Sequence, residues 1–509
     1  MLVLTIAGLG VAVATSRAQS PATGTDPVLI GYERLHQGDL SGASQYFEDQ
    51  LKRAPDDLAF RFGWLMAEQA RIQLAPGRTA QFEKDLDAII ALGEARYERT
   101  HEDVGALFYL ANAYLMRAAY RFDHDKGMWG AARDGANAKS YVEAYLKVYP
   151  RDGDAYLVLG SYNYYVDIIP TFFKFMRLLM FLPSGNRVEG LKQLERASTE
   201  GRLFAPLARR ILMEAYATFE GRTTEAIAMG EQLRQQYPGS DAAATSLAEV
   251  YASAGVEDHT RAAAIYEGIV QRHAAATSAE GIAARSQALL GLAGQRQEDF
   301  RIDDAIAILT PTIDAPPAQP GWVFPQFLLR RANFRALLDD PRASEDAKRV
   351  QTEAKQENFR KGAAEMVTWI DGRRASGEAA RYAALVPPNR MVAEGKWDEA
   401  RKVYDDIRAR EPQNFLVQYR LAYLDFISGS IARALPEFVR LSATRAASES
   451  IRAMALLYVG RAYDVTGHRA EALKTYRQVV DDYDKQQRAA DFARVGLLTP
   501  YKTKPARTP

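Results

Sequence analysis

The feature that most limits the folds open to this chain is a pattern of small and aromatic residues that recurs about every 34 residues. Near the C-terminus, Ala400 and Ala434 lie 34 residues apart, and Ala434 and Ala472 lie 38 apart. An aromatic residue stands four positions after each of these alanines: Tyr404, Phe438 and Tyr476. Because a period of this length is the signature of stacked helical repeats, the pattern predicts that two helices pack together in each period.

A second spacing places the end of each unit. In four regions a proline follows the small residue by 12 positions, as in Ala43 to Pro55, Ala138 to Pro150, Ala226 to Pro238 and Ala305 to Pro317. Proline cannot continue a helix, so it closes the second helix of a pair. Together the spacings resemble the tetratricopeptide repeat over most of the chain. We predict an all-α fold, an α-solenoid of about ten tetratricopeptide-like helix pairs.

Breaks in the pattern divide the chain. We expect an N-terminal array over residues 26–370, a linker at 371–390 and a C-terminal array with a capping helix at 391–498. The linker is expected because two adjacent prolines, Pro387 and Pro388, would each cost about 3 kcal/mol inside a helix. Residues 499–509 contain three prolines and scattered basic residues, which predicts a disordered tail.

The N-terminal residues 1–18 are expected to be a signal peptide. Leu2 to Thr15 is a run of 14 mostly apolar residues, shorter than the roughly 20 that a membrane-spanning helix needs. A small-x-small cleavage site ends at Ala18. No Lys or Arg precedes the run, which leaves open a start upstream of Met1. The mature protein is therefore expected to be periplasmic or secreted in a bacterium, with membrane association as an addition to that.

An apolar insert interrupts one repeat at residues 166–183. The template separates its glycine and alanine by 12 residues, whereas Gly160 and Gly190 lie 30 apart, so 18 residues are inserted. A helix from Pro170 to Leu182 would be about 20 Å long, too short to cross a bilayer. Three interpretations stay open: a helix packed on the solenoid, a helix in a membrane interface, and a docking site for an apolar partner. The side chains proposed for membrane or apolar contact are Phe172, Phe173, Met176 and Phe181.

The insert also carries a narrower resemblance. The run from Ile169-Pro170 to Phe181-Leu182-Pro183, followed by Gly185 to Leu191, is similar to a signature of the tetratricopeptide repeat protein 39 family. That eukaryotic family is linked to the outer mitochondrial membrane and to lipid-related roles. The resemblance implies a helical-repeat protein that works near a membrane, although the export signal departs from the family.

The first helices of tetratricopeptide repeats line a concave groove, with positions 2, 5, 9 and 12 of each unit pointing into it. These positions select the candidate partner-binding residues Tyr419, Tyr423, Phe426, Leu457, Arg461 and Tyr164. Their aromatic character suits the burial of an extended or helical peptide. The alternative is that they pack only against adjacent repeats. The Lys and Asn pairs that clamp a carboxylate in chaperone-binding members are missing from these positions.

Composition and motifs argue against chemistry. The chain has no cysteine, and its 65 Lys plus Arg balance 64 Asp plus Glu, which disfavours thiol chemistry and nucleic-acid binding. Neither a phosphate-binding loop nor a paired-histidine metal motif occurs. We therefore expect no enzyme activity, no cofactor and no metal site. The predicted function is a non-enzymatic scaffold or adaptor that binds proteins in the bacterial cell envelope. The alternative is a helical-repeat protein that binds a membrane or apolar ligand through residues 166–183.

Overall fold

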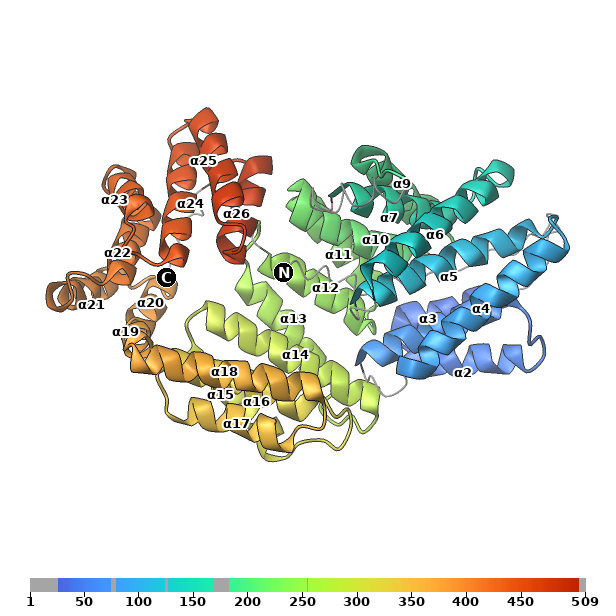
Figure 1. Cartoon of the computed structure of the whole chain (residues 1–509), viewed down its shortest axis with the longest axis horizontal. Coiled ribbons are helices and arrows are strands. Elements are labelled where there is room, and N and C mark those ends of the chain that lie inside the picture. Colours follow the sequence, from blue (N-terminus) through green and yellow to red (C-terminus); the bar gives the residue numbers. More distant parts are fainter. Residues whose placement is uncertain (1–25, 75–78, 124–126, 169–182, 254, 503–509) are drawn as a thin grey trace. The chain divides into compact units, whose positions relative to one another are not determined.

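The structure of the chain is a computed structural model that describes residues 26–74, 79–123, 127–168, 183–253 and 255–502 (Figure 1). Three expectations fall outside these ranges: the signal peptide at 1–18, the apolar side chains Phe172, Phe173, Met176 and Phe181, and the last seven residues of the tail. Within the described ranges the chain forms helices joined by turns, with no β-strand. The predicted all-α class is confirmed.

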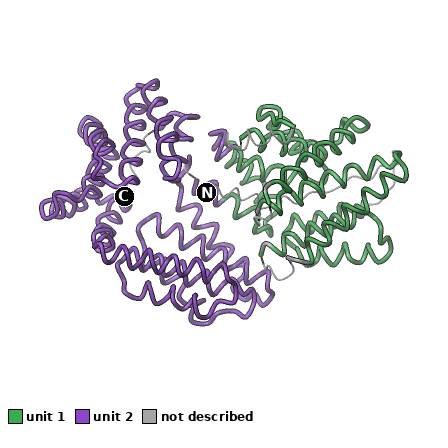
Figure 2. The backbone as a smooth tube through the Cα atoms, in the orientation of Figure 1, with its two compact units in different colours: residues 1–215, 224–247 green, residues 216–223, 248–509 purple. Residues whose placement is uncertain are grey.

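The chain divides into two compact units, shown in different colours in Figure 2. Unit 1 comprises residues 1–215 and 224–247, and unit 2 comprises residues 216–223 and 248–509. In each unit, helices that follow one another in the sequence pack against one another, as expected of a helical-repeat solenoid. None of the helices in the described part of the chain is long and apolar enough to span a bilayer.

The helices of unit 1 are α1 (Pro27–Gln37), α2 (Leu40–Leu51), α3 (Leu58–Leu74), α4 (Thr79–Arg99), α5 (Val104–Asp123), α6 (Met128–Val148), α7 (Ala155–Ile168), α9 (Arg187–Glu200), α10 (Ala205–Ala215), α11 (Thr223–Gln236) and the first part of α12 (Asp241–Ala252).

The helices of unit 2 are the π-helical segment η1 (Tyr216–Glu220), the end of α12, α13 (His259–Arg272), α14 (Ala279–Glu298), α15 (Ile302–Asp314), α16 (Val323–Leu337), α17 (Arg342–Glu353), α18 (Glu357–Ala375), α19 (Glu378–Ala383), α20 (Val386–Ala393), α21 (Trp397–Arg410), α22 (Phe415–Ile427), α23 (Ile431–Ala443), α24 (Glu449–Val465), α25 (Arg469–Asp482) and α26 (Gln487–Leu498).

A left-handed residue makes the turn inside many of the helix pairs. Glycine serves at Gly38, Gly221, Gly395, Gly429 and Gly467, whose φ angles lie between 65° and 86°. Glycine has no Cβ and adopts this conformation without strain. Three pairs of unit 2 use other residues in the same place: Glu257, Phe300 and Asp339. The recurrence of one turn geometry confirms that the pairs are copies of one unit.

The aromatic residue that follows the repeat alanine packs against glycine. Phe47 and Tyr476 are both fully buried. A Cβ on Gly31 or Gly63 would overlap the ring of Phe47, and a Cβ on Gly460 would lie 2.6 Å from the ring of Tyr476. The second helix thus inserts a ring where the neighbouring first helix has no side chain. This contact explains why the sequence keeps both residue types at fixed spacing.

The expected linker at 371–390 differs in the structure. Helix α18 runs to Ala375, α19 follows, and α20 begins at Val386, so most of this segment is helical. Pro387 and Pro388 lie in the first turn of α20, where backbone N–H groups have no helical partner to lose. The first helix of this repeat is short and starts at the prolines. The division into compact units instead falls between residues 215 and 248.

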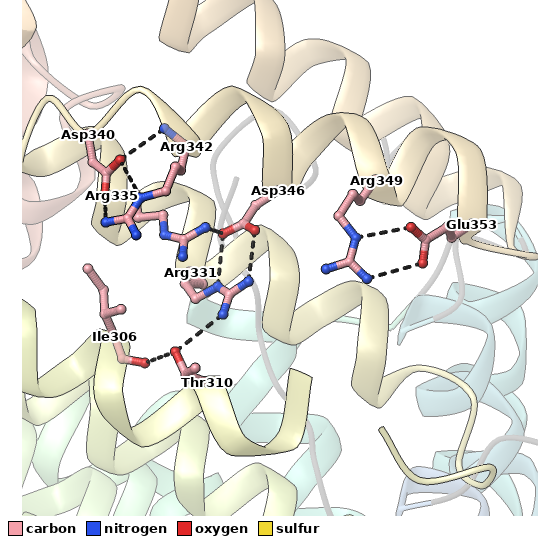
Figure 3. A network of polar contacts seen from close by, with 9 residues as sticks. All are labelled: Ile306, Thr310, Arg331, Arg335, Asp340, Arg342, Asp346, Arg349 and Glu353. Atoms are coloured by element: carbon pink, nitrogen blue, oxygen red, sulfur yellow. Dashed lines mark hydrogen bonds and ion pairs between the residues drawn. The ribbon is translucent and has the colours of Figure 1, made fainter. Parts of the chain in front are cut away.

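A buried ion-pair network joins α16 and α17 in unit 2 (Figure 3). Arg331 donates to both carboxylate oxygens of Asp346 at 2.9 Å, and Arg335 donates to the same carboxylate at 2.7 Å. Asp346 is only 2% exposed. Removing one partner of such a buried group typically costs about 3–5 kcal/mol, because the remaining charge is left without compensation. By contrast, the pair between Arg349 and Glu353 lies at the surface and stabilises little.

Candidate partner-binding face

Helices α22 and α24 of unit 2 carry five of the six candidate groove residues. Each helix begins at a capping side chain: Asn414 accepts from the backbone N–H of Val417, and Ser448 accepts from that of Ile451. Such caps satisfy backbone donors that have no partner inside the helix. The two helices pack against each other and against α23, which lies between them in the sequence.

The structure buries most of these candidates. Tyr419 and Arg461 are 5% exposed, Phe426 and Leu457 are 0% exposed, and Tyr423 is half-buried. Tyr419, Tyr423 and Phe426 come together in one apolar cluster. Leu457 belongs to a neighbouring cluster around the ring of Tyr476. These side chains are covered by the chain itself, as the packing alternative anticipates, and their contact with a partner stays a prediction.

Tyr164, the sixth candidate, lies on α7 in unit 1 and is 0% exposed. It is packed in the insert-bearing repeat, edge to face with Tyr165 at 5.4 Å between ring centroids. The structure therefore does not make Tyr164 part of the face formed by α22 and α24.

The centre of the face is Tyr458, which the repeat template did not select. Its ring centroid lies 5.2 Å from those of Phe426 and Phe438 and 5.4 Å from that of Tyr423. In the unit that begins at Ala453 it takes position 6, which is not one of the groove positions. Its aromatic type, beside two selected positions, was the available signal. Burial raises the pKa of Tyr458, so the hydroxyl stays protonated.

Arg461 is held among aromatic rings. Its guanidinium carbon lies 4.4 Å from the ring centroid of Tyr501, 4.5 Å from that of Phe492 and 5.0 Å from that of Tyr458. It also donates to the Tyr458 hydroxyl at 3.0 Å. Within the described part of the chain, none of the ion pairs includes Arg461. Desolvated contacts of this kind stabilise by about 2 kcal/mol, so the rings hold the buried cation.

The start of the C-terminal tail lies on this face. The carboxylate of Asp464, which is 0% exposed, pairs with Arg469 at 2.9 Å, accepts from the Tyr476 hydroxyl at 2.9 Å, and accepts the backbone N–H of Tyr501 at 2.8 Å. Thr499 is extended, with φ −133° and ψ 131°. The ring of Tyr501 lies 5.8 Å from that of Phe426. Residues 499–502 therefore have a defined place, in contrast to the disordered tail expected from residue 499 onward.

Two further arginines surround the aromatic cluster. Arg488 pairs with Glu298 at 2.8 Å. The guanidinium of Arg420 lies 5.2 Å from the ring of Phe300 and 5.8 Å from that of Tyr419. Its Nε is buried and makes no hydrogen bond to any described residue. The face is therefore aromatic and basic, which are the characters of residues that contribute most at protein interfaces.

The insert-bearing repeat of unit 1 brings the two ends of the insert together. The Tyr162 hydroxyl donates to the carbonyl of Pro183 at 2.8 Å, and Lys139 Nζ donates to the carbonyl of Ser184 at 3.2 Å. The backbone N–H of Arg187 donates to Asp167 at 3.1 Å. These bonds join the end of α7 to the segment that leads into α9.

The packing of α7 on α9 confirms the repeat position assigned to the insert. A Cβ on Gly160 would lie 2.8 Å from the backbone nitrogen of Leu194. In the C-terminal pair the equivalent contact joins Gly460 to Tyr476, 16 residues later, whereas Gly160 and Leu194 lie 34 apart. The difference, 34 − 16 = 18, equals the predicted insertion.

Exposed aromatic side chains lie at the level of the insert. Phe122, at the end of α5, is 39% exposed, and Trp129, at the start of α6, is 48% exposed. Gly135 of α6 faces the ring of Tyr162 of α7, at 3.5 Å from a Cβ. Counting six residues from this contact reaches Trp129 on α6 and Ile168 on α7, about 9 Å along each helix. Because the helices are antiparallel, Trp129 lies near the point where the insert leaves α7.

The described residues include no cluster of His, Asp and Glu that could hold a metal ion. Asp154 of unit 1 is the buried titratable group with the clearest altered pKa. Burial raises the pKa of Asp154 to about 7, although the backbone N–H groups of Phe204, Arg202 and Leu203 favour its charged form. These donors belong to the turn before α10, so the carboxylate positions that helix.

Comparisons with known proteins support the repeat. Residues 454–485 match the tetratricopeptide repeat family, over α24 and α25. Comparison with curated protein sequences gives no match, so the resemblance to the tetratricopeptide repeat protein 39 family stays a prediction. Among solved structures, that of Naa15/Naa10 bound to HypK-THB is similar over 94% of this chain and 84% of that chain, with 16% identity and a TM-score of 0.27. A score this low carries no argument about binding.

Proposed function

We propose that the protein is a non-enzymatic helical-repeat scaffold that binds protein partners through the face formed by α22 and α24. The supporting observation is that this face already holds an extended peptide segment, residues 499–502, through a buried carboxylate and an aromatic-stacked arginine. Helical-repeat proteins bind extended segments on such faces. The tetratricopeptide match covers α24, which contributes both groups.

The half-buried residues at the edge of this face offer the contacts for a partner. Arg420 has a charged group without an ion pair among the described residues, and Tyr423 contacts Tyr458 while keeping part of its ring accessible. Both residue types contribute large contact energies when a partner covers them. The proposed partner therefore has an acidic or aromatic segment that can extend across α22.

Affinity capture from an extract of the cell envelope tests the proposal. The chain carrying Arg420→Glu and Tyr423→Ala should lose a partner that the natural chain retains. Arg445→Glu is the matched control, because Arg445 is exposed at the turn after α23 and does not face the cluster. Equal capture by all three chains would contradict binding at this face, and no captured protein would contradict the scaffold function.

The envelope location rests on the expected signal peptide at residues 1–18. The mass of the chain purified from its own cells tests this location. A mature protein that begins after Ala18 would support export, and a chain that retains residues 1–18 would contradict it.

A second candidate function, contact with a membrane or apolar ligand, is favoured by the exposed Phe122 and Trp129 near the ends of the insert. Aromatic side chains of this kind insert into the interfacial region of a bilayer. Flotation with vesicles of anionic lipid tests it. Changing Phe122 and Trp129 to Ser, or Phe172 and Phe173 to Asp, should abolish flotation, whereas Trp369→Ser, a 41% exposed residue of α18, should not. Absence of flotation by the natural chain would rule this function out.

A further inference from the structure

The chain's own residues 499–502 are bound on the face of α22 and α24 as a peptide ligand would be. The backbone N–H of Tyr501 is fixed by Asp464, 37 residues earlier in the sequence. The ring of Tyr501 lies between the guanidinium of Arg461 and the ring of Phe426. The contact combines one backbone hydrogen bond with one side-chain slot, which is how proteins recognise extended segments.

The slot favours a particular kind of residue. Burial raises the pKa of Tyr501 to about 12, against the opposing effect of Arg461. Its hydroxyl donates to no described residue, so the ring alone is recognised and phenylalanine would fit equally. Pro500 restricts the residue before it to an extended conformation, which matches Thr499. The recognised element is therefore an extended segment in which an aromatic residue follows proline.

We propose that this slot is the recognition site for a Pro-aromatic segment of a partner protein, and that the chain's own Pro500 and Tyr501 occupy it until the partner displaces them. The inference rests on the proposed scaffold function and adds the chemistry of the partner. A tethered segment competes at an effective concentration in the millimolar range. The partner must therefore add contacts beyond the slot, and Arg420 and Tyr423 lie on the same face to provide them.

A peptide copied from the chain itself tests the slot without an identified partner. The probe is a fluorescent peptide of residues 497–504, and the proteins are the full natural chain and the full chain carrying Tyr501→Ala. Because the natural segment blocks its own slot, the Tyr501→Ala chain should bind the peptide at least tenfold more tightly. The Tyr501→Phe chain should behave as the natural chain does. A peptide with alanine in place of tyrosine should bind to none of them.

A spin label provides the second measurement. The chain has no cysteine, so Lys502→Cys creates a unique site for the label, one residue beyond the slot. The label should be immobilised in the natural background and mobile when Tyr501→Ala is added. A mobile label in both backgrounds would overturn the proposal. So would equal peptide binding by the natural and Tyr501→Ala chains.

The two proposals fail in different ways. If a partner is captured equally by the natural and Tyr501→Ala chains, and the peptide binds to neither, the scaffold function holds and the slot is overturned. If the peptide binds only to the Tyr501→Ala chain but no envelope protein is captured, the slot holds and the scaffold function is contradicted.

Discussion

The insert-bearing pair α7–α9 and the C-terminal pair α24–α25 are built on one template but close their helices differently. In the C-terminal pair, the space left by Gly460 is filled by the ring of Tyr476. In the insert-bearing pair, Leu194 stands in the aromatic position, and a Cβ on Gly160 would meet its backbone nitrogen, while one on Gly190 would overlap that of Tyr164. Without a ring between them the helices approach until their backbones touch. The template thus fixes the small residue but not what fills its space.

Each pair also buries one aspartate, and the two carboxylates are satisfied differently. Asp154, just before α7, accepts from three backbone N–H groups and has no basic partner among its hydrogen bonds. Asp464, near the end of α24, pairs with Arg469 and accepts from Tyr476 and Tyr501. The first carboxylate fixes the turn before the next helix, and the second holds the C-terminal segment. Only the second creates a binding slot.

The largest expected effect is on the ring that fills the C-terminal pair. Tyr476→Ala should lower the free energy of unfolding of unit 2 by about 3–5 kcal/mol, because it removes a fully buried aromatic side chain. Tyr463→Ala, on the half-buried face of α24, should cost about 1 kcal/mol. Urea unfolding measures both. Equal losses would contradict the special role of the ring.

The glycines distinguish backbone contact from ring contact. Gly190→Ala should cost about 3 kcal/mol, because the new Cβ would meet main-chain atoms that cannot move aside. Gly460→Ala should cost about 1–2 kcal/mol, because the ring of Tyr476 can shift. Thermal unfolding of the two variants gives the comparison. A larger loss for Gly460→Ala would reverse the account of how the two pairs close.

The smallest expected effect is the pH dependence that Asp154 confers. Because burial raises the pKa of Asp154 to about 7, the folded chain keeps a proton that the unfolded chain releases above about pH 4. Stability should therefore fall as pH rises from about 4 to about 7, by at most about 1.4 kcal/mol per pH unit. Asp154→Asn should remove this slope. Unfolding measured from pH 4 to pH 8 provides the test, and an unchanged slope would place its origin elsewhere.

Much of the fold could be predicted because repeat spacing is a local property of the sequence. The helix pairs and the length of the insertion in the repeat after Gly160 follow from it. The short helix that begins at Pro387 could not be predicted, since the template assumes a first helix of full length. The prolines were therefore placed in a linker.

The candidate site was predicted less well, because spacing shows which positions face inward but not what covers them. The central role of Tyr458 depends on contacts with three helices. The order of residues 499–502 depends on Asp464, which is remote in sequence. Neither relationship leaves a periodic signal.

Paired capture by Tyr501→Ala and Tyr501→Phe chains from an envelope extract tests the central claim most directly. The first variant opens the slot on α24, and the second keeps it filled with an equivalent ring. The account predicts an envelope protein enriched about tenfold on the Tyr501→Ala chain, in line with release of a tethered competitor, and lost again when Arg420→Glu is added. The same proteins in equal amounts on both chains would contradict it.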